Sequence, residues 1–160
     1  MVGRIRFALE GFDLPRHRSH VAFFVRPHSR MTQNFHAGYV GVDVMPACLQ
    51  IGFADREFGT QDYLSLQRAP EFDEQDRRMG MAEVYVERND QGFSGYGGME
   101  RFELFPDRIR VRFSESRAQV MAGFREMEIT FELSREQLSA LQAGLCRCFT
   151  GFSYYVDHVA

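Results

Sequence analysis

Residues 62–113 read DYLSLQRAPEFDEQDRRMGMAEVYVERNDQGFSGYGGMERFELFPDRIRVRF, and this stretch carries the clearest indications of the fold. Polar and apolar residues alternate at 63–68 and at 108–113, a period of two that is typical of half-buried strands. Pro106 and Asp107 form a turn dipeptide, so we expect residues 102–113 to make a hairpin. The stretch therefore predicts an antiparallel sheet.

The sequence on either side extends this sheet and adds a helix. Residues 4–9, 21–25, 39–44 and 48–53 also resemble strands, whereas 27–36 is polar and is expected to be a loop. Acidic residues alternate with apolar ones at 127–133, and an antiparallel partner at 108–113 would place glutamates opposite arginines.

Ser134 and Gln137 form a capping box, and Leu138, Leu141 and Leu145 follow at helical spacing. We thus predict an α+β fold, a mostly antiparallel β-sheet with one C-terminal amphipathic helix at about 134–150 packed on it. The aromatic segment 152–159 is expected to be a last strand or a packed tail.

Composition narrows the class of protein. A chain of 160 residues is predicted to form one domain over 1–160. No apolar run is long enough to span a bilayer, and the charged N-terminus is unlike a signal peptide, so we expect a cytoplasmic protein without membrane contact. Three cysteines make a disulfide framework improbable, and reduced thiols are expected. All 19 basic residues are arginine, which excludes lysine-based catalysis.

Charge is distributed unevenly along the chain. Residues 51–100 hold eleven acidic residues and five arginines, although the net charge of the whole chain is only −3. The basic footprint of a nucleic-acid-binding protein is missing. The acidic region is either a solvated surface or a surface that attracts a basic partner.

The sequence shows only weak signals for a phosphate-binding, metal-binding or catalytic site. The segment 89–98, NDQGFSGYGG, is polar and glycine-rich and is expected to be a tight connection between strands with glycines at positive φ. A phosphate cradle is the alternative, but the P-loop ending is absent. The histidines at 17, 20, 28 and 36 lack a metal-binding pattern, and no nucleophile motif is present, so we expect no cofactor, no metal and no catalytic residue.

Four segments together carry a family resemblance. They are YLSLQR at 63–68, VYVERNDQ at 84–91, SGYGG at 94–98 and FELFPDRIRVRF at 102–113. In these segments the chain resembles the immunity protein ten family, small proteins encoded beside toxins in bacterial polymorphic toxin systems. Residues 1–50 show no matching feature. The resemblance implies a mostly β fold and a non-catalytic protein that neutralises a cognate toxin from an adjacent gene by direct binding. The expected mode of neutralisation is occlusion of the toxin's active site.

An inhibitor of a toxin with a basic active site would cover it with acidic groups, and aromatic residues are enriched as interface anchors. On that basis we predict a partner-binding set. It comprises Asp62, Arg68, Glu71, Asp73, Glu74, Asp76, Glu87, Asp90, Phe93 and Tyr96. Of these we expect Phe93 and Tyr96 to be the best exposed. Two alternatives remain open, a small-ligand or nucleotide-binding β-domain that uses 89–98 and a subunit of another assembly that uses the aromatic tail.

Overall fold

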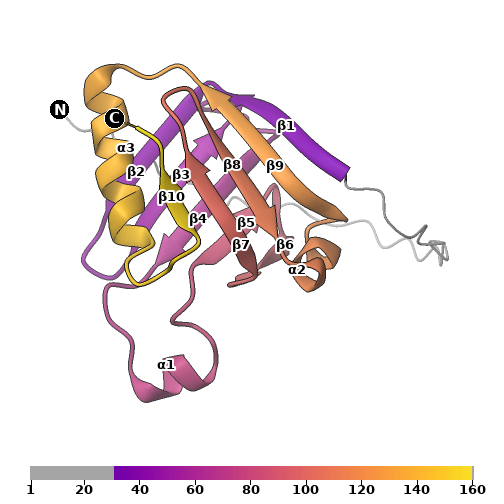
Figure 1. The fold of residues 1–160 in the computed structure, drawn as a ribbon, viewed down its shortest axis with the longest axis vertical. Coiled ribbons are helices and arrows are strands. Elements are labelled where there is room, and N and C mark those ends of the chain that lie inside the picture. The colour runs from indigo at the N-terminus through magenta and orange to yellow at the C-terminus, as the bar shows by residue number, and fades with distance from the viewer. Residues whose placement is uncertain (1–30, 160) are drawn as a thin grey trace, which may run out of the picture.

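The protein is seen in a computed structural model that describes residues 31–159, and these form two stacked five-stranded sheets (Figure 1). The A sheet has the order β1 (Met31–Ala37), β9 (Phe124–Phe131), β8 (Arg108–Phe113), β7 (Met99–Leu104) and β10 (Tyr155–Asp157). The B sheet has the order β2 (Tyr39–Val44), β3 (Leu49–Ala54), β4 (Tyr63–Arg68), β5 (Tyr85–Arg88) and β6 (Asp90–Tyr96). The described chain is thus mostly β, as predicted, but it forms two sheets instead of one.

Pairing within the sheets is mainly antiparallel. All neighbours in the B sheet are antiparallel, whereas β1 runs parallel to β9 and β10 runs parallel to β7 at the two edges of the A sheet. Strand β1 corrects the loop expected at 27–36, because its backbone pairs with β9 despite its polar side chains. The strands expected at 4–9 and 21–25 lie outside the described residues.

The core lies between the two sheets. The apolar side chains of alternate positions point inward, so Leu64, Leu66 and Val86 of the B sheet are fully buried. Phe53 of the B sheet stacks on Phe131 of the A sheet, with ring centroids 6.2 Å apart. Facing sheets that share one apolar interior define a β-sandwich.

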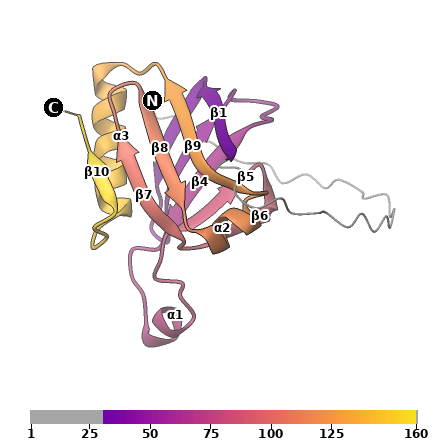
Figure 2. The same cartoon turned by 45° about the vertical axis from the view of Figure 1, so that its right-hand side comes forward.

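Helix α3 (Arg135–Cys148) lies along one open side of the sandwich (Figures 1 and 2). Its capping box uses Ser134 and Gln137. Gly144 packs so closely on Val42 of β2 that a Cβ would come within 2.8 Å of it, while Gln142 donates a hydrogen bond to Asp157 of β10 at 2.8 Å. The helix therefore packs against β2, β3 and β4 of the B sheet and is also bonded to β10 at the edge of the A sheet. It does not have the length and apolar composition needed to cross a bilayer, nor does any other helix in residues 31–159.

The cysteines on α3 point in opposite directions. Cys146 is exposed, whereas Cys148 is buried, and burial raises the pKa of the Cys148 thiol to about 12. Cys48 is half-buried near the end of the β2–β3 turn, and its thiol donates to the carbonyl oxygen of Leu49 at 3.4 Å. All three thiols are free.

The hairpin of β7 and β8 and the pairing of β8 with β9 agree with the sequence predictions. Arg110 lies opposite Glu128 with 2.5 Å between Nε and Oε2, and Arg112 lies opposite Glu126 at 3.2 Å. The outer face of the A sheet is therefore a lattice in which opposite charges compensate one another.

Two short helices accompany α3, where the sequence predicted a single helix. Helix α1 (Glu74–Arg78) lies in the acidic segment and α2 (Glu115–Val120) follows β8. The sequence segment 89–98 is also not a loop, because most of it forms strand β6 at the edge of the B sheet. Three of its four glycines have positive φ, at +152° for Gly95, +65° for Gly97 and +79° for Gly98.

Arg117 of α2 explains why this strand is rich in glycine. Its guanidinium donates hydrogen bonds to the carbonyl oxygens of Ser94, Tyr96 and Gly97. A Cβ at Gly98 would come within 2.7 Å of the Arg117 side chain. Small residues thus let the arginine lie flat against the backbone and hold β6 to α2.

Replacing Arg117 by alanine should leave three backbone carbonyl groups without their charged donor. We expect the free energy of unfolding to fall by about 3 kcal/mol, since hydrogen bonds to charged groups contribute about 1.5–3 kcal/mol each and this guanidinium is partly solvated. Urea denaturation followed by circular dichroism measures the change. The matched control is Arg112→Ala, whose exposed ion pair should contribute at most about 1 kcal/mol. Equal losses in the two variants would contradict this role for Arg117.

Candidate partner-binding face

Strand register places three rows of side chains on the solvent side of the B sheet, which we call the outer B face. Because Leu64 and Leu66 point into the core, Tyr63, Ser65 and Gln67 of β4 point outward. The rows that pair across the strands are Tyr39, Ala54 and Tyr63; then Gly41, Gly52, Ser65, Glu87 and Ser94; and then Asp43, Gln50, Gln67, Tyr85 and Tyr96.

Tyrosine is concentrated on this face. Four of the six tyrosines of the chain lie here, at positions 39, 63, 85 and 96. Tyr85 and Tyr96 meet edge to face with centroids 5.1 Å apart, and the Tyr85 hydroxyl donates to Ser94 Oγ at 2.7 Å. Tyrosine and serine are the residue types that dominate antibody paratopes, because rigid rings supply contact area at low entropic cost.

In the middle row, the residues on β2, β3 and β4 have small side chains or none, so the surface is low there. Gly41 and Gly52 have no side chain, and Ser65 is buried beneath Gln50, whose Nε2 lies 3.5 Å from Ser65 Oγ. Taller side chains stand in the rows on both sides. The outer B face therefore has a low strip that ends at Glu87.

Glu87 is the central carboxylate of this face. It accepts a hydrogen bond of 2.6 Å from the Tyr63 hydroxyl. Burial raises the pKa of Tyr63 strongly, and the hydrogen bond and negative charge of Glu87, together with the charge of Asp90, raise it further. The tyrosine thus stays a neutral donor that holds the carboxylate in place.

Carboxylates on the two outer faces differ in their partners. On the A sheet the glutamates at 103, 126 and 128 each pair with arginine. Among the described residues, no ion pair engages Asp43, Glu57, Glu87 or Asp90 on the B-sheet side. Within residues 31–159, glutamates pair with arginines on the outer A face, whereas these four carboxylates near the B sheet form no ion pair.

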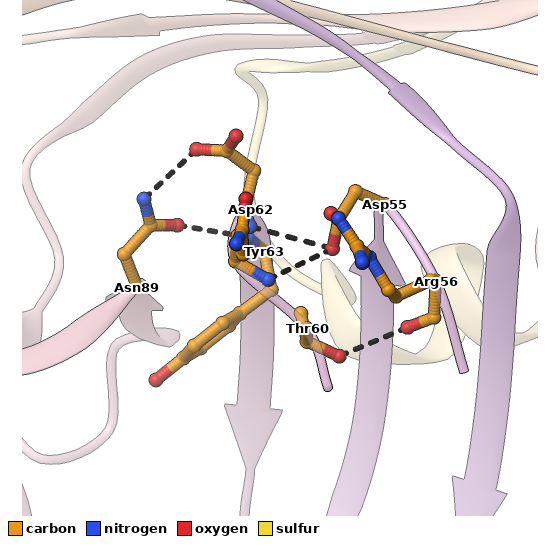
Figure 3. Close-up of polar contacts among 7 residues, drawn as sticks. Asp55, Arg56, Thr60, Asp62, Tyr63 and Asn89 are labelled. Atoms are coloured by element: carbon orange, nitrogen blue, oxygen red, sulfur yellow. Dashed lines mark hydrogen bonds and ion pairs between the residues drawn. The ribbon is translucent and has the colours of Figure 1, made fainter. Parts of the chain in front are cut away.

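The carboxylates of Asp55 and Asp62 accept hydrogen bonds in and beside the β3–β4 loop at one end of this face (Figure 3). Asp55 Oδ1 accepts hydrogen bonds from the backbone N–H groups of Gln61 and Asp62, at 3.0 Å and 3.4 Å. Burial alone would raise the pKa of Asp55, but these hydrogen bonds and Arg56 bring it below its ordinary value.

Asn89 completes this corner (Figure 3). Its backbone adopts a φ of +56°, and its side chain accepts a hydrogen bond from Tyr63 N at 2.8 Å while donating to Asp62 Oδ1 at 3.0 Å. Asp62 also accepts from Gln33 of β1 at 3.3 Å. Asp62 therefore links the two sheets through Oδ1.

At the opposite end of the face, residues 69–83 form an arm that projects beyond the sandwich and carries α1 (Figures 1 and 2). No residue of α1 is buried, and its start is stabilised by a capping box between Asp73 and Asp76. Glu71 and Glu74 are exposed on the arm. The acidic segment of the sequence is thus a short exposed helix beside the tyrosine-rich face.

Arg68 fixes the base of the arm. Its Nη1 donates to the carbonyl oxygens of Cys148 and Thr150, at 2.6 Å and 2.8 Å. Its guanidinium carbon lies 4.7 Å from the ring centroid of Phe152 and 5.5 Å from that of Phe72. This predicted partner-binding residue serves mainly to tie the arm to the end of α3.

A hollow of about 440 Å³ lies between the arm and the outer B face, and we call it the arm cleft. The arm contributes Phe72, Asp76 and Met81. The sheet contributes residues that include Gln67, Tyr85, Glu87, Gln91 and Tyr96. Four of the ten predicted site residues line it, namely Arg68, Asp76, Glu87 and Tyr96.

Of the predicted partner-binding residues, some are exposed and some are not. Tyr96 is exposed at 39%, as expected, but Phe93 packs against the core, 6.0 Å from the guanidinium carbon of buried Arg88. Asp90 is exposed and accepts a local hydrogen bond from Gly92 N at 2.6 Å. Sequence reasoning missed Tyr39, Asp43 and Gln67, because only strand register shows that they share a face with Tyr96.

The geometry also bears on the alternatives. The segment 94–97 turns carbonyl oxygens toward Arg117, an arrangement that suits a cation and opposes a phosphate. The aromatic tail is engaged within the chain, where Tyr155 stacks on Phe149 at 5.1 Å. Within residues 31–159, no cluster of three or more histidine, cysteine or acidic side chains is arranged to hold a metal ion.

Residues 31–159 thus form a β-sandwich with a tyrosine-rich outer face and a projecting arm. The family model described as Immunity protein 10 matches residues 36–139. The chain belongs to this family. Comparison with curated proteins finds no significant match. The matched region contains the whole outer B face and the arm.

Substitutions at Asn89 test how this corner is held. Asn89→Gly keeps the positive φ accessible but removes both side-chain hydrogen bonds, so we expect a loss of about 1–2 kcal/mol in the free energy of unfolding. Asn89→Ala should lose about 1 kcal/mol more, because a Cβ disfavours the left-handed conformation. Urea denaturation measures both. The neighbouring exposed Gln91→Ala is the control, and an alanine variant no less stable than the glycine variant would refute the backbone argument.

Proposed function

We propose that this protein is a non-catalytic, cytoplasmic immunity protein that binds a cognate polymorphic toxin and blocks its active site. The partner is the toxin encoded beside it. Membership of the immunity protein family supports this function. The choice of surface rests on the carboxylates of the outer B face, which form no ion pair within residues 31–159. The proposed interface comprises the outer B face and the arm.

Physical chemistry favours this face over the A sheet. Burying the A-sheet lattice would strip water from ion pairs that already satisfy one another, which returns little free energy. Burying the outer B face instead brings uncompensated carboxylates and tyrosine rings against a partner. Opposite charge on that partner would accelerate encounter and make it dependent on salt. Tyrosines near the centre would supply the anchors that slow dissociation.

Co-expression tests the function itself. The product of the adjacent gene is expressed in bacteria alone and together with this protein, and the pair is purified through a tag on one partner. We expect toxicity alone, rescue by co-expression, and co-purification as a stable complex. Toxicity that persists in the presence of soluble, folded protein would refute the proposed function.

Charge reversal tests the surface. Glu71 and Glu74 are exposed and make no bond required for the capping box, so Glu71→Arg with Glu74→Arg should preserve the fold. We expect association with the toxin to slow by about tenfold and its salt dependence to weaken, as measured by stopped-flow fluorescence. The control reverses two exposed glutamates elsewhere, Glu100 and Glu132. Equal effects of the two pairs would rule out a specific role for the arm.

A further inference from the structure

The arm cleft combines three features that single it out on the outer B face. It is a real hollow of about 440 Å³, its walls carry the rings of Phe72, Tyr85 and Tyr96, and two carboxylates, Asp76 and Glu87, line it from opposite sides. The arm and the sheet each contribute one of these acids. A ligand in the cleft would therefore contact both structural elements at once.

The charged residues that line the cleft are Asp76, Glu87 and Arg68, so carboxylates outnumber guanidinium groups by two to one. Glu87 accepts one hydrogen bond from Tyr63, which holds the carboxylate without neutralising it. Asp76 accepts from the backbone N–H of Asp73 at the start of α1, 3.1 Å from Oδ2. Arg68 also borders the cleft, but its Nη1 donates hydrogen bonds to the carbonyl oxygens of Cys148 and Thr150 at the end of α3.

The side chains that line the arm cleft favour a guanidinium group over an anion or an apolar group. Aromatic rings attract a cation over their faces, and a planar guanidinium also stacks and can bond a carboxylate through two N–H groups. Gln67 and Gln91 add amide oxygens that accept further N–H groups. An anion would meet two carboxylates, and a purely apolar group would leave them desolvated.

We propose that the arm cleft receives an arginine side chain from the toxin, so that this arginine anchors the complex. The inference rests on the proposed function for the identity of the partner. The guanidinium lies between Glu87 and Asp76 against the tyrosine rings. It joins the arm, which is otherwise attached mainly at its base, to the outer B face.

A fragment titration tests the cleft without the toxin. Nα-acetyl-L-arginine amide is added to ¹⁵N-labelled protein and compared with the citrulline analogue, which has nearly the same shape without the charge. We expect chemical-shift changes at the side-chain amides of Gln67 and Gln91 and at the backbone of Tyr85, Glu87 and Tyr96. The citrulline compound should bind about tenfold more weakly, because it lacks the charge that strengthens the hydrogen bonds.

Conservative variants locate the binding. Asp76→Asn with Glu87→Gln removes both charges but keeps oxygens that can accept from Asp73 N and from the Tyr63 hydroxyl, so the fold should persist. We expect this double variant to weaken arginine amide binding about tenfold. Glu126→Gln on the A sheet is the control and should have no effect.

Three fragment results would overturn the inference. They are equal binding of the citrulline analogue, shifts located on the A sheet, and no saturable shift up to about 50 mM, a range that covers the weak affinity of a fragment this small.

Toxin binding by wild type and by the double variant distinguishes the proposed arginine anchor from the proposed immunity function. A toxin that binds wild type and the double variant equally would overturn the arginine anchor and leave the immunity function standing. A toxin that binds neither would count against the immunity function, and the fragment titration would still decide the cleft. A toxin complex that forms with wild type and dissociates at least about tenfold faster with the double variant would support both.

Discussion

Burial of the two inner sheet faces against each other is the constraint on which the rest of this structure depends. Leu64, Leu66 and Val86 must face Ile129 and Phe131 across the interior, because each is fully or almost fully buried there. A shift of one residue in register would turn every side chain of a strand to the opposite face. The apolar positions therefore also determine which tyrosines and carboxylates reach solvent.

Arginine, the only basic residue type in the chain, performs two different tasks. Arg68 and Arg117 bond backbone carbonyl groups and fasten the arm and β6 to the sandwich. On the A sheet, arginines such as Arg110 instead pair with glutamate across strands. Within residues 31–159, none of the ion pairs engages Asp43, Glu87 or Asp90 of the outer B face. The described part of the chain therefore uses its arginines differently on the two outer faces.

The protein's architecture separates stability from recognition. The sandwich and α3, tied together by the hydrogen bonds of Arg68 and Arg117, form a scaffold. The side chains proposed for binding lie on its outside or on an arm whose helix has no buried residue. Such residues can vary with little effect on the core. A family that must match different toxins would need that independence, because each partner demands its own surface while the same fold is kept.

The alternation of polar and apolar residues in the sequence determined several strands, one hairpin and their pairing. The alternation at 63–68 and 108–113, the turn at Pro106 and Asp107, and the pairing of arginine with glutamate rows follow from the period of a strand and appear in the structure. The family, too, was recognisable from short segments. Only the tertiary structure decided the division into two sheets, because alternation shows that a strand has a buried face without showing which strand covers it. It also made 90–96 an edge strand under Arg117, and it gathered Tyr39, Tyr63, Tyr85 and Tyr96, far apart in the chain, onto one face through hydrogen-bond register.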